Sequence, residues 1–248
     1  MMHRKTACFI CFVFFAAISC VQAGWREQLQ TVFKPLQQAS LSDTQIGQGL
    51  KEALMTGVDH AVKKASAAGG YFQNEQIKIK FPQQLSMVEK GLRTIGMGSK
   101  IDDFEKSVNR AAEAAAPQAK GALLDAVMGM SFEDARTILK GGDTAATDYF
   151  KQKTWNRLYQ MVAPSMKKTL DQYSVSQKYD QLLGAYNKIP LAAKPKLISA
   201  DQYATAKALD GLFVLIAEQE KKIRTDPQAR ITDLLKSVFA STGKNNKL

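Results

Sequence analysis

Apolar residues recur every three or four positions along most of this chain, which is the spacing of one face of an α-helix. The clearest helix start is Ser42-Asp43-Thr44-Gln45, a capping box in which the serine hydroxyl and the glutamine side chain each bond a backbone amide of the other residue. The apolar stripe that follows ends at Gly69-Gly70. The same spacing predicts further helices, with Pro117 starting or kinking one of them, over residues 83–95, 101–115, 117–127, 131–140, 144–173, 179–187, 199–217 and 227–239.

One stretch alternates instead, because Ile77, Ile79 and Phe81 are separated by lysines and closed by Pro82. With no second such run to pair with, an ordinary sheet is not expected, and the stretch is predicted to be a loop that crosses the helical body. We therefore predict an all-α fold, a single multi-helix domain with one short extended arm. The expected parts are a signal peptide at 1–23, an N-terminal helical lead-in at 24–40, an all-helical domain at 41–240 and a disordered tail at 241–248.

The first residues predict export. Arg4 and Lys5 precede an apolar stretch from Ala7 to Ile18, and Val21-Gln22-Ala23 follows as the cleavage site before Gly24, which is the layout of a secretory signal peptide. The apolar stretch is shorter than the roughly 20 residues that a membrane-spanning helix needs, and no later run is longer, so no transmembrane helix is expected in the mature chain. A minority alternative is a lipoprotein, because the four residues ending at Cys20 resemble the acylation motif of lipoprotein processing.

The positions of the cysteines exclude a disulfide in the mature chain, and the net charge indicates which classes of molecule it could bind. All three cysteines lie in or beside the predicted signal peptide, so the mature chain would hold no disulfide. The net charge is +11, and loss of Arg4 and Lys5 leaves +9. A basic exported protein attracts polyanions, which in a bacterial envelope are lipid headgroups, lipopolysaccharide or wall polymers; nucleic acid fits the charge but not the compartment.

The stretch LKGGDTAATDYF, residues 139–150, looks at first like a phosphate-binding loop. Its glycines lack the spacing and the preceding strand of the known phosphate-binding motifs. We interpret it as a corner, in which a helix ends at Lys140, a glycine takes the left-handed conformation, and Asp143 or Thr144 caps the next helix. An anion at that helix start would be repelled by Asp143.

Catalytic chemistry is scarce. The mature chain would hold one histidine, His60, predicted to lie at the edge of its helix, and no cysteine, so no catalytic residue, metal site or cofactor is predicted. Ser165 and Lys168 match S-x-x-K without the accompanying motifs of penicillin-binding enzymes. A buried pair of carboxylates would suffice for glycoside hydrolysis, and Asp210 is the acid closest to an apolar stripe; its alternative role is an ion pair with an arginine such as Arg110 or Arg224.

Two further patterns on the helices have competing interpretations. Lys151, Trp155 and Tyr159 stack one turn apart and form a candidate interface stripe, whose alternative is ordinary core packing. Glu220 and Arg224 are four residues apart, an arrangement typical of a solvated helix surface.

The chain resembles an exported bacterial family catalogued as domain of unknown function 4197. The resemblance is carried by GLKEAL from Gly49, NRAAEAAAP from Asn109, the LKGGDTAATDYF stretch, KALDGLF from Lys207 and EKKIRTDPQAR from Glu220. It implies export and one helical domain, and it brings no activity. Its motifs suggest one polar network or ligand-binding cluster made of Asn109, Arg110, Glu113, Asp143, Thr144, Asp148 and Asp210.

Three functions remain open from the sequence. The first is a non-enzymatic, periplasmic helical protein that binds a lipid, another anionic envelope component or a protein partner. The second is a carboxylate-dependent hydrolase of cell-wall glycans. The third is a structural or assembly protein tethered as a lipoprotein. The sequence does not decide the oligomeric state.

Overall fold

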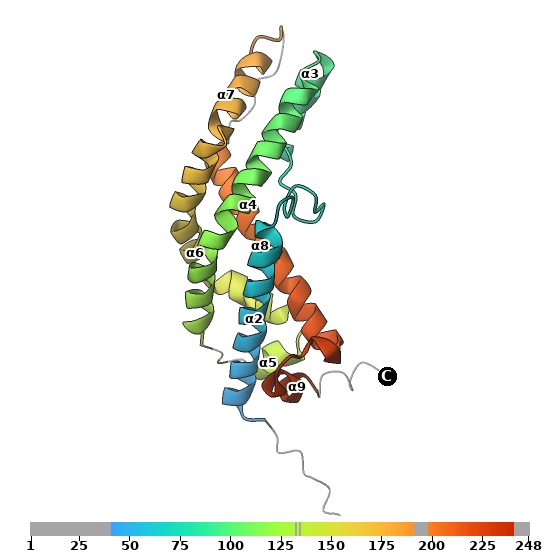
Figure 1. Cartoon of the computed structure of the whole chain (residues 1–248), viewed down its shortest axis with the longest axis vertical. Coiled ribbons are helices and arrows are strands. Elements are labelled where there is room, and N and C mark those ends of the chain that lie inside the picture. The colour runs from blue at the N-terminus through green and yellow to red at the C-terminus, as the bar shows by residue number, and fades with distance from the viewer. Residues whose placement is uncertain (1–40, 132, 134, 191–197, 241–248) are drawn as a thin grey trace, which may run out of the picture. The chain divides into compact units, whose positions relative to one another are not determined.

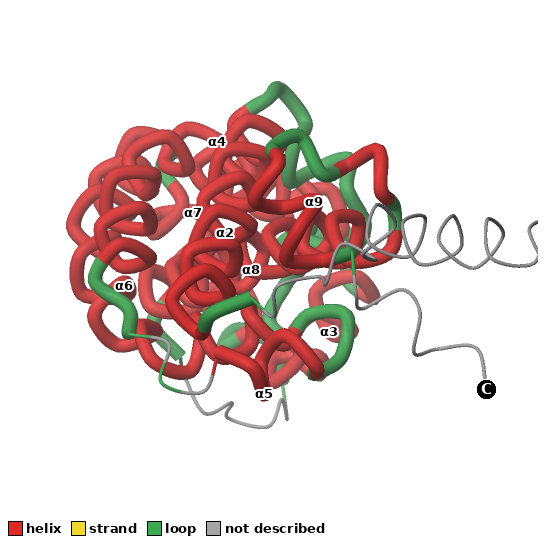
Figure 2. Tube along the Cα trace, turned by 90° about the horizontal axis from the view of Figure 1, so that it is seen from below, coloured by secondary structure: helices red, strands yellow, loops and turns green. Residues whose placement is uncertain are grey.

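Four long helices form the body of the protein in the computed structural model, which describes residues 41–240 apart from Phe132, Asp134 and residues 191–197. They are α2 (Asp43–Ser66), α4 (Gly98–Met128), α6 (Ala145–Gln172) and α8 (Ala200–Thr225). Each packs mainly against two others, in the cyclic order α2, α4, α6, α8 (Figures 1 and 2). The predicted all-α fold is confirmed, since the described residues contain helices and no strand. The predicted signal peptide, lead-in and tail lie outside the described residues.

Shorter helices complete the domain. α3 (Ser86–Thr94) and α7 (Val175–Tyr186) pack against each other and against α4, and α5 (Ala135–Lys140) and α9 (Asp233–Phe239) pack against α2. Short 3₁₀ turns at Gln83–Leu85 and Pro227–Ala229 precede α3 and α9. The predicted capping box is confirmed, because the Ser42 hydroxyl accepts from the Gln45 amide and the Gln45 side chain accepts from the Ser42 amide.

Two predicted helix starts are wrong. Pro117 does not start a separate helix; it is exposed within the continuous α4, where alanines such as Ala116 and Ala119 are buried in the bundle. Asp226-Pro227 begins only a 3₁₀ turn, and the last helix starts later, where the Thr232 hydroxyl accepts from the Leu235 amide. α2 also ends at Ser66, before the two glycines.

Glycines set how closely some elements approach. A Cβ at Gly57 of α2 would lie 3.0 Å from the Ile216 side chain of α8. A Cβ at Gly211 would lie 2.7 Å from Cε1 of Tyr71, a residue that is completely buried where the 67–82 segment crosses α8. Contacts this short leave no room for a methyl group, so these helix faces depend on glycine.

Replacing Gly211 with alanine is expected to destabilise the protein by about 1–3 kcal/mol, because the Tyr71 ring has to move in a filled core. The matched control is Gly121→Ala in α4, where nothing lies within 4 Å of the added Cβ. That change should stabilise the protein by up to about 1 kcal/mol through helix propensity. Urea unfolding of both variants checks this, and equal effects at the two positions would contradict it.

Candidate functional site

The corner at residues 139–144 is where the sequence most resembles a binding loop. α5 ends at Lys140 and α6 starts after Thr144, as predicted. Neither glycine of the corner is left-handed, since the glycines with positive φ among the described residues are Gly69 and Gly96. The Thr144 side chain also does not cap α6. The position of the corner between α5 and α6 is therefore as predicted. The left-handed glycine and the Thr144 cap that were expected to stabilise it are absent.

Glu220 of α8 supplies the missing cap of α6. One carboxylate oxygen accepts from the Ala146 amide at 2.9 Å, and the other accepts from the Thr147 amide at 2.7 Å and from the Thr147 hydroxyl at 2.6 Å. The Glu220 side chain is 1% exposed. A helix N-terminus carries unpaired amides and a partial positive charge, so a buried carboxylate fits it.

Arg224 lies one turn further along α8 and completes the corner. Its Nε donates to Glu220 at 2.7 Å, while its terminal nitrogens donate to the carbonyl oxygens of Leu139 and Ile138 at the end of α5. Arg230 caps α8 in the same way, donating to the carbonyls of Ile223 and Arg224. The prediction that Glu220 and Arg224 lie on a solvated surface is wrong, because both are buried against the ends of α5 and α6.

This geometry opposes phosphate binding at the corner. The two free amides that would coordinate an anion at the start of α6 already donate to Glu220. A second anion there would meet the buried carboxylate and Asp143, which pairs with Lys221 at 3.2 Å. The LKGGDTAATDYF stretch therefore forms a turn between two helices, and the acceptor for its free amides is Glu220 of α8.

A second set of polar side chains, on α4, holds the 67–82 segment. Asn109 is completely buried; its carbonyl oxygen accepts from the Ile79 amide and its amide nitrogen donates to the Ile79 carbonyl. One turn to either side, Glu113 accepts from the amides of Tyr71 and Phe72, and Glu105 accepts from the Phe81 amide. The three side chains are spaced i, i+4, i+8 and take the place of a neighbouring strand, so the predicted arm needs no sheet.

The other predicted polar residues fall elsewhere. The Thr144 hydroxyl donates to Asp148 at 2.8 Å, which places these two at the start of α6. Asp210 pairs with Lys151 of α6 at 2.7 Å, not with Arg110 or Arg224, and Arg110 is exposed on α4. Among the described residues, no hydrogen bond links the three predicted residues of α4 (Asn109, Arg110 and Glu113) to those at the start of α6 or to Asp210. The seven residues are thus distributed over three places in the bundle.

Lys151, Trp155 and Tyr159 lie at the contact between α6 and α8. The Lys151 ammonium sits 5.0 Å from the ring centroid of Trp155 and 5.7 Å from that of Phe213, besides its pair with Asp210. Trp155 and Phe213 pack with their ring centroids 6.0 Å apart. Trp155 and Tyr159 are partly buried against the core. The stripe is therefore occupied largely by contacts within the protein.

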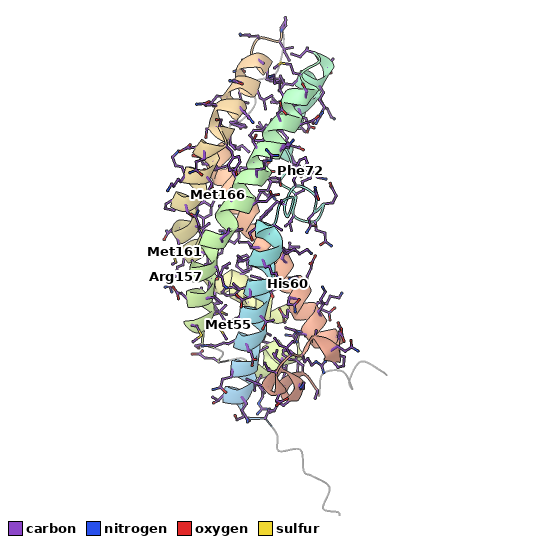
Figure 3. All side chains as sticks on the ribbon, viewed as in Figure 1. Met55, His60, Phe72, Arg157, Met161 and Met166 are labelled. Atoms are coloured by element: carbon purple, nitrogen blue, oxygen red, sulfur yellow. The ribbon has the colours of Figure 1, made fainter. Side chains whose placement is uncertain are left out.

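The opposite, outer face of α6 is cationic. Residues 149–170 contain five basic and no acidic side chains; Lys151 pairs with Asp210, and Lys167 pairs with Asp171 and Asp201. The remaining three are exposed and make no ion pair within the described residues; they are Lys153, Arg157 and Lys168. At 3.6 residues per turn they fall within about 60° of each other around the axis and span about 22 Å along it. Figure 3 shows Arg157 and Met161 on the same edge of α6.

The sequence analysis did not single out this face. The signal that reveals it is the absence of acids between Asp148 and Asp171, combined with helical spacing of the basic residues. Which of the five cations lack an ion pair could not be read from the sequence, because Asp210 and Asp201, which pair with Lys151 and Lys167, lie on α8.

His60 lies on α2 at its contact with α8. Its Nδ1 is buried without a hydrogen-bond partner. Burial, followed by the positive charges of Lys222 and Lys64, lowers the pKa of His60 below its ordinary value, and Glu218 opposes this shift. Lys64 itself pairs with Glu218 at 2.9 Å. The neutral form of the imidazole is thus favoured.

The interior of the bundle is filled. A small apolar cavity of about 10 Å³ lies between α4, α6 and α8 and is lined by side chains such as Ala112, Val162 and Leu212. That is about the room for one water molecule, whereas small-molecule pockets are typically about 300–1,000 Å³. Within the described residues, no three His, Cys, Asp or Glu side chains are grouped to hold a metal ion. None of the helices described is both long and apolar enough to cross a membrane.

Comparison with known proteins gives one match. The model of a family described as a protein of unknown function (DUF4197) matches residues 40–240, which is nearly the whole described domain. No curated protein and no solved structure matches the chain.

Replacing Glu220 with glutamine is expected to destabilise the protein by about 3–5 kcal/mol, because Arg224 then remains buried without its charged partner. The matched control is Glu218→Gln, two residues away, which breaks an exposed ion pair and should cost about 1 kcal/mol or less. Denaturant unfolding measures both. A Glu220→Gln variant as stable as the control would show that the corner does not depend on this carboxylate.

The lowered pKa of His60 should make stability depend on pH. A pKa lower in the folded than in the unfolded protein stabilises the fold above the unfolded value of about 6.5, and this contribution is lost as the pH falls towards the folded pKa. His60→Gln should remove that loss in unfolding measurements between pH 7 and 5. In NMR titrations, Lys222→Gln should move the His60 midpoint towards 6.5 more than Lys63→Gln does; the reverse order would contradict the assignment.

Proposed function

The chain belongs to the DUF4197 family, whose description names no activity, and we propose that it is an exported, non-enzymatic protein that binds an anionic, phosphate-bearing component of the cell envelope. The observation that carries the proposal is the outer face of α6, where Lys153, Arg157 and Lys168 are exposed without ion pairs among the described residues. Lipid headgroups and phosphate-bearing polymers share the chemistry that this face would bind.

The length and rigidity of the cationic face support binding to an extended target. Three cations spread over about 22 Å of one helix match a surface or polymer with repeated negative charges better than a single small anion. The face is preorganised, because α6 is capped at its start by Glu220 and packed along its length against α4 and α8. Little backbone entropy is then lost when the face binds, and the remaining entropic cost is that of ordering the three exposed side chains.

The uses of the buried polar residues support binding rather than catalysis. Glu113 accepts from two backbone amides, Asn109 makes its bonds to the 67–82 segment and to its own helix, and Glu220 caps α6. Asp210, the preferred acid for a glycan hydrolase, is paired with Lys151. Each of these side chains has a structural contact that a reaction at that position would have to replace.

The filled interior supports binding at the surface. A cavity of about 10 Å³ does not take an acyl chain. A lipid partner would therefore be contacted through its headgroup rather than enclosed in the bundle. The predicted signal peptide places such headgroups and polymers within reach of the exported chain.

The test is a Lys153→Gln, Arg157→Gln, Lys168→Gln triple variant. With about 1 kcal/mol for each basic residue at an anionic surface, its affinity for vesicles containing phosphatidylglycerol should fall on the order of 100-fold at low salt. Its affinity for polyphosphate should fall in the same direction, and parent binding should weaken as salt rises. Co-sedimentation and isothermal titration measure the two ligands.

A control triple variant separates position from net charge. Lys120→Gln, Lys221→Gln, Lys236→Gln removes the same charge from lysines that already pair with Asp59, Asp143 and Asp233. It should bind nearly as the parent does. Loss of vesicle binding alone would assign the face to lipid, and loss of polyphosphate binding alone to polymers. Equal binding by the parent and the α6 variant, or equal losses in both variants, would overturn the proposal.

A further inference from the structure

The segment around α3 exposes large apolar side chains far from the α6 face in sequence. Met87 is 64% exposed and Ile95 is 50% exposed. Both belong to the end of the bundle where α3, the start of α4 and α7 meet (Figure 1). Neither side chain takes part in the inner face of α3, so both are available for a contact outside the domain.

The inner face of α3 is closed by other residues. Val88 and Leu92 are completely buried. Gly91 faces α7 so closely that a Cβ there would lie 3.0 Å from the ring of Tyr186. Met87 and Ile95 therefore lie outside a contact that is already filled, and a small rotation of α3 could not bury them without breaking it.

The turn after α3 is rigid. Gly96 is left-handed at φ 82°, its amide donates to the Arg93 carbonyl, and the Met97 amide donates to the Leu92 carbonyl. These two hydrogen bonds form the Schellman motif, which satisfies the last carbonyls of a helix. Ile95 is thus presented to solvent by a fixed turn rather than by a loose end.

Exposed lysines lie on the same group of elements as the apolar residues, and two of the nearby acids are already paired. Arg93 donates to both Glu89 and Asp102 at 3.0 Å, so these two carboxylates share one guanidinium. Three exposed lysines make no ion pair within the described part of the chain; they are Lys90 on α3, Lys100 on α4 and Lys188 after α7. We call Met87, Ile95 and these three lysines the α3 surface.

We propose that the α3 surface docks on an anionic phospholipid bilayer, with Met87 and Ile95 entering the boundary between headgroups and acyl chains. Interfacial helices combine such apolar side chains with lysines that attract anionic lipids. Lysine stems cover apolar surface while the ammonium groups stay at the headgroups. A protein partner fits less well, because the centres of protein interfaces are depleted in lysine. This contact does not depend on the α6 face.

The experiment uses the protein exported by its host, so that the predicted signal peptide has been removed, with its mass checked for the N-terminus. An Ile95→Trp variant is mixed with phosphatidylglycerol–phosphatidylcholine vesicles whose acyl chains are brominated near the headgroup. Its fluorescence should be quenched well beyond that of the parent, whose Trp25 and Trp155 set the background. With vesicles of phosphatidylcholine alone, the quenching should be at least several-fold weaker.

Two controls keep the result specific. Ile231 is 71% exposed between the Pro227–Ala229 turn and α9, at the end of the bundle far from α3 (Figure 1), and Ile231→Trp should show no added quenching. The Met87→Ser, Ile95→Ser double variant replaces exposed side chains only, so it should fold as the parent does and sediment less with anionic vesicles. Equal quenching at positions 95 and 231, or no quenching at 95, would overturn the α3 contact.

The α6 triple variant distinguishes this proposal from the preceding one. If polyphosphate binding fails in that variant while Ile95→Trp is still quenched, both proposals stand. If the α6 triple variant binds both vesicles and polyphosphate as the parent does while the quenching is present, the α6 proposal fails alone. If polyphosphate binds through α6 and Ile95→Trp stays unquenched, the protein meets anions without entering the bilayer and the α3 proposal fails alone.

Discussion

The buried pair of Glu220 and Arg224 is the interaction on which the lower half of the bundle depends. Two helices end and begin within a few residues at the corner, which leaves free carbonyls on α5 and free amides on α6 in a region that water does not reach. One anion and one cation on consecutive turns of α8 satisfy both ends. Phe239 of α9 lies 5.4 Å from the Arg224 guanidinium and closes the other side. The corner, α8 and the C-terminal helix therefore form one cooperative unit.

The same principle recurs on α4, where Glu105, Asn109 and Glu113 bond the backbone of the 67–82 segment. A segment without a sheet or helix of its own still has to satisfy its amides and carbonyls when it is buried. Side chains at helical spacing do this here. Asn109 and Glu113, which look like candidates for chemistry in the sequence, are in this way used to hold backbone.

Local signals in the sequence were sufficient for much of the fold. The helical period gave the all-α class, Ser42 and Gln45 gave the start of α2, and Lys140 with its two glycines gave the end of α5. Helix boundaries that depend on packing could not be predicted from the sequence. Pro117 indicates a helix break, yet α4 is continuous through it and buries the alanines around it.

The candidate site was harder to predict than the fold, and the reason is distance along the chain. Glu220 and Arg224 have the same i, i+4 spacing whether a helix is buried or solvated, so only their partners some 74 and 86 residues away distinguish the two cases. The pair of Lys151 and Asp210 could not be predicted for the same reason, because the two residues lie 59 positions apart. The free cations of α6 became visible only after these partners were known.

The cap of α6 can form only after a much later part of the chain has been synthesised. The amides of Ala146 and Thr147 have no local acceptor, and their partner is made 73 or more residues later. A chain that emerges from its N-terminus, whether from a ribosome or through a membrane pore, holds α6 with an open first turn until α8 has followed. Contacts this far apart are costly to close and slow to form. The corner can therefore close only after Glu220 has emerged, so the first turn of the cationic helix is capped by a residue from near the end of the described domain.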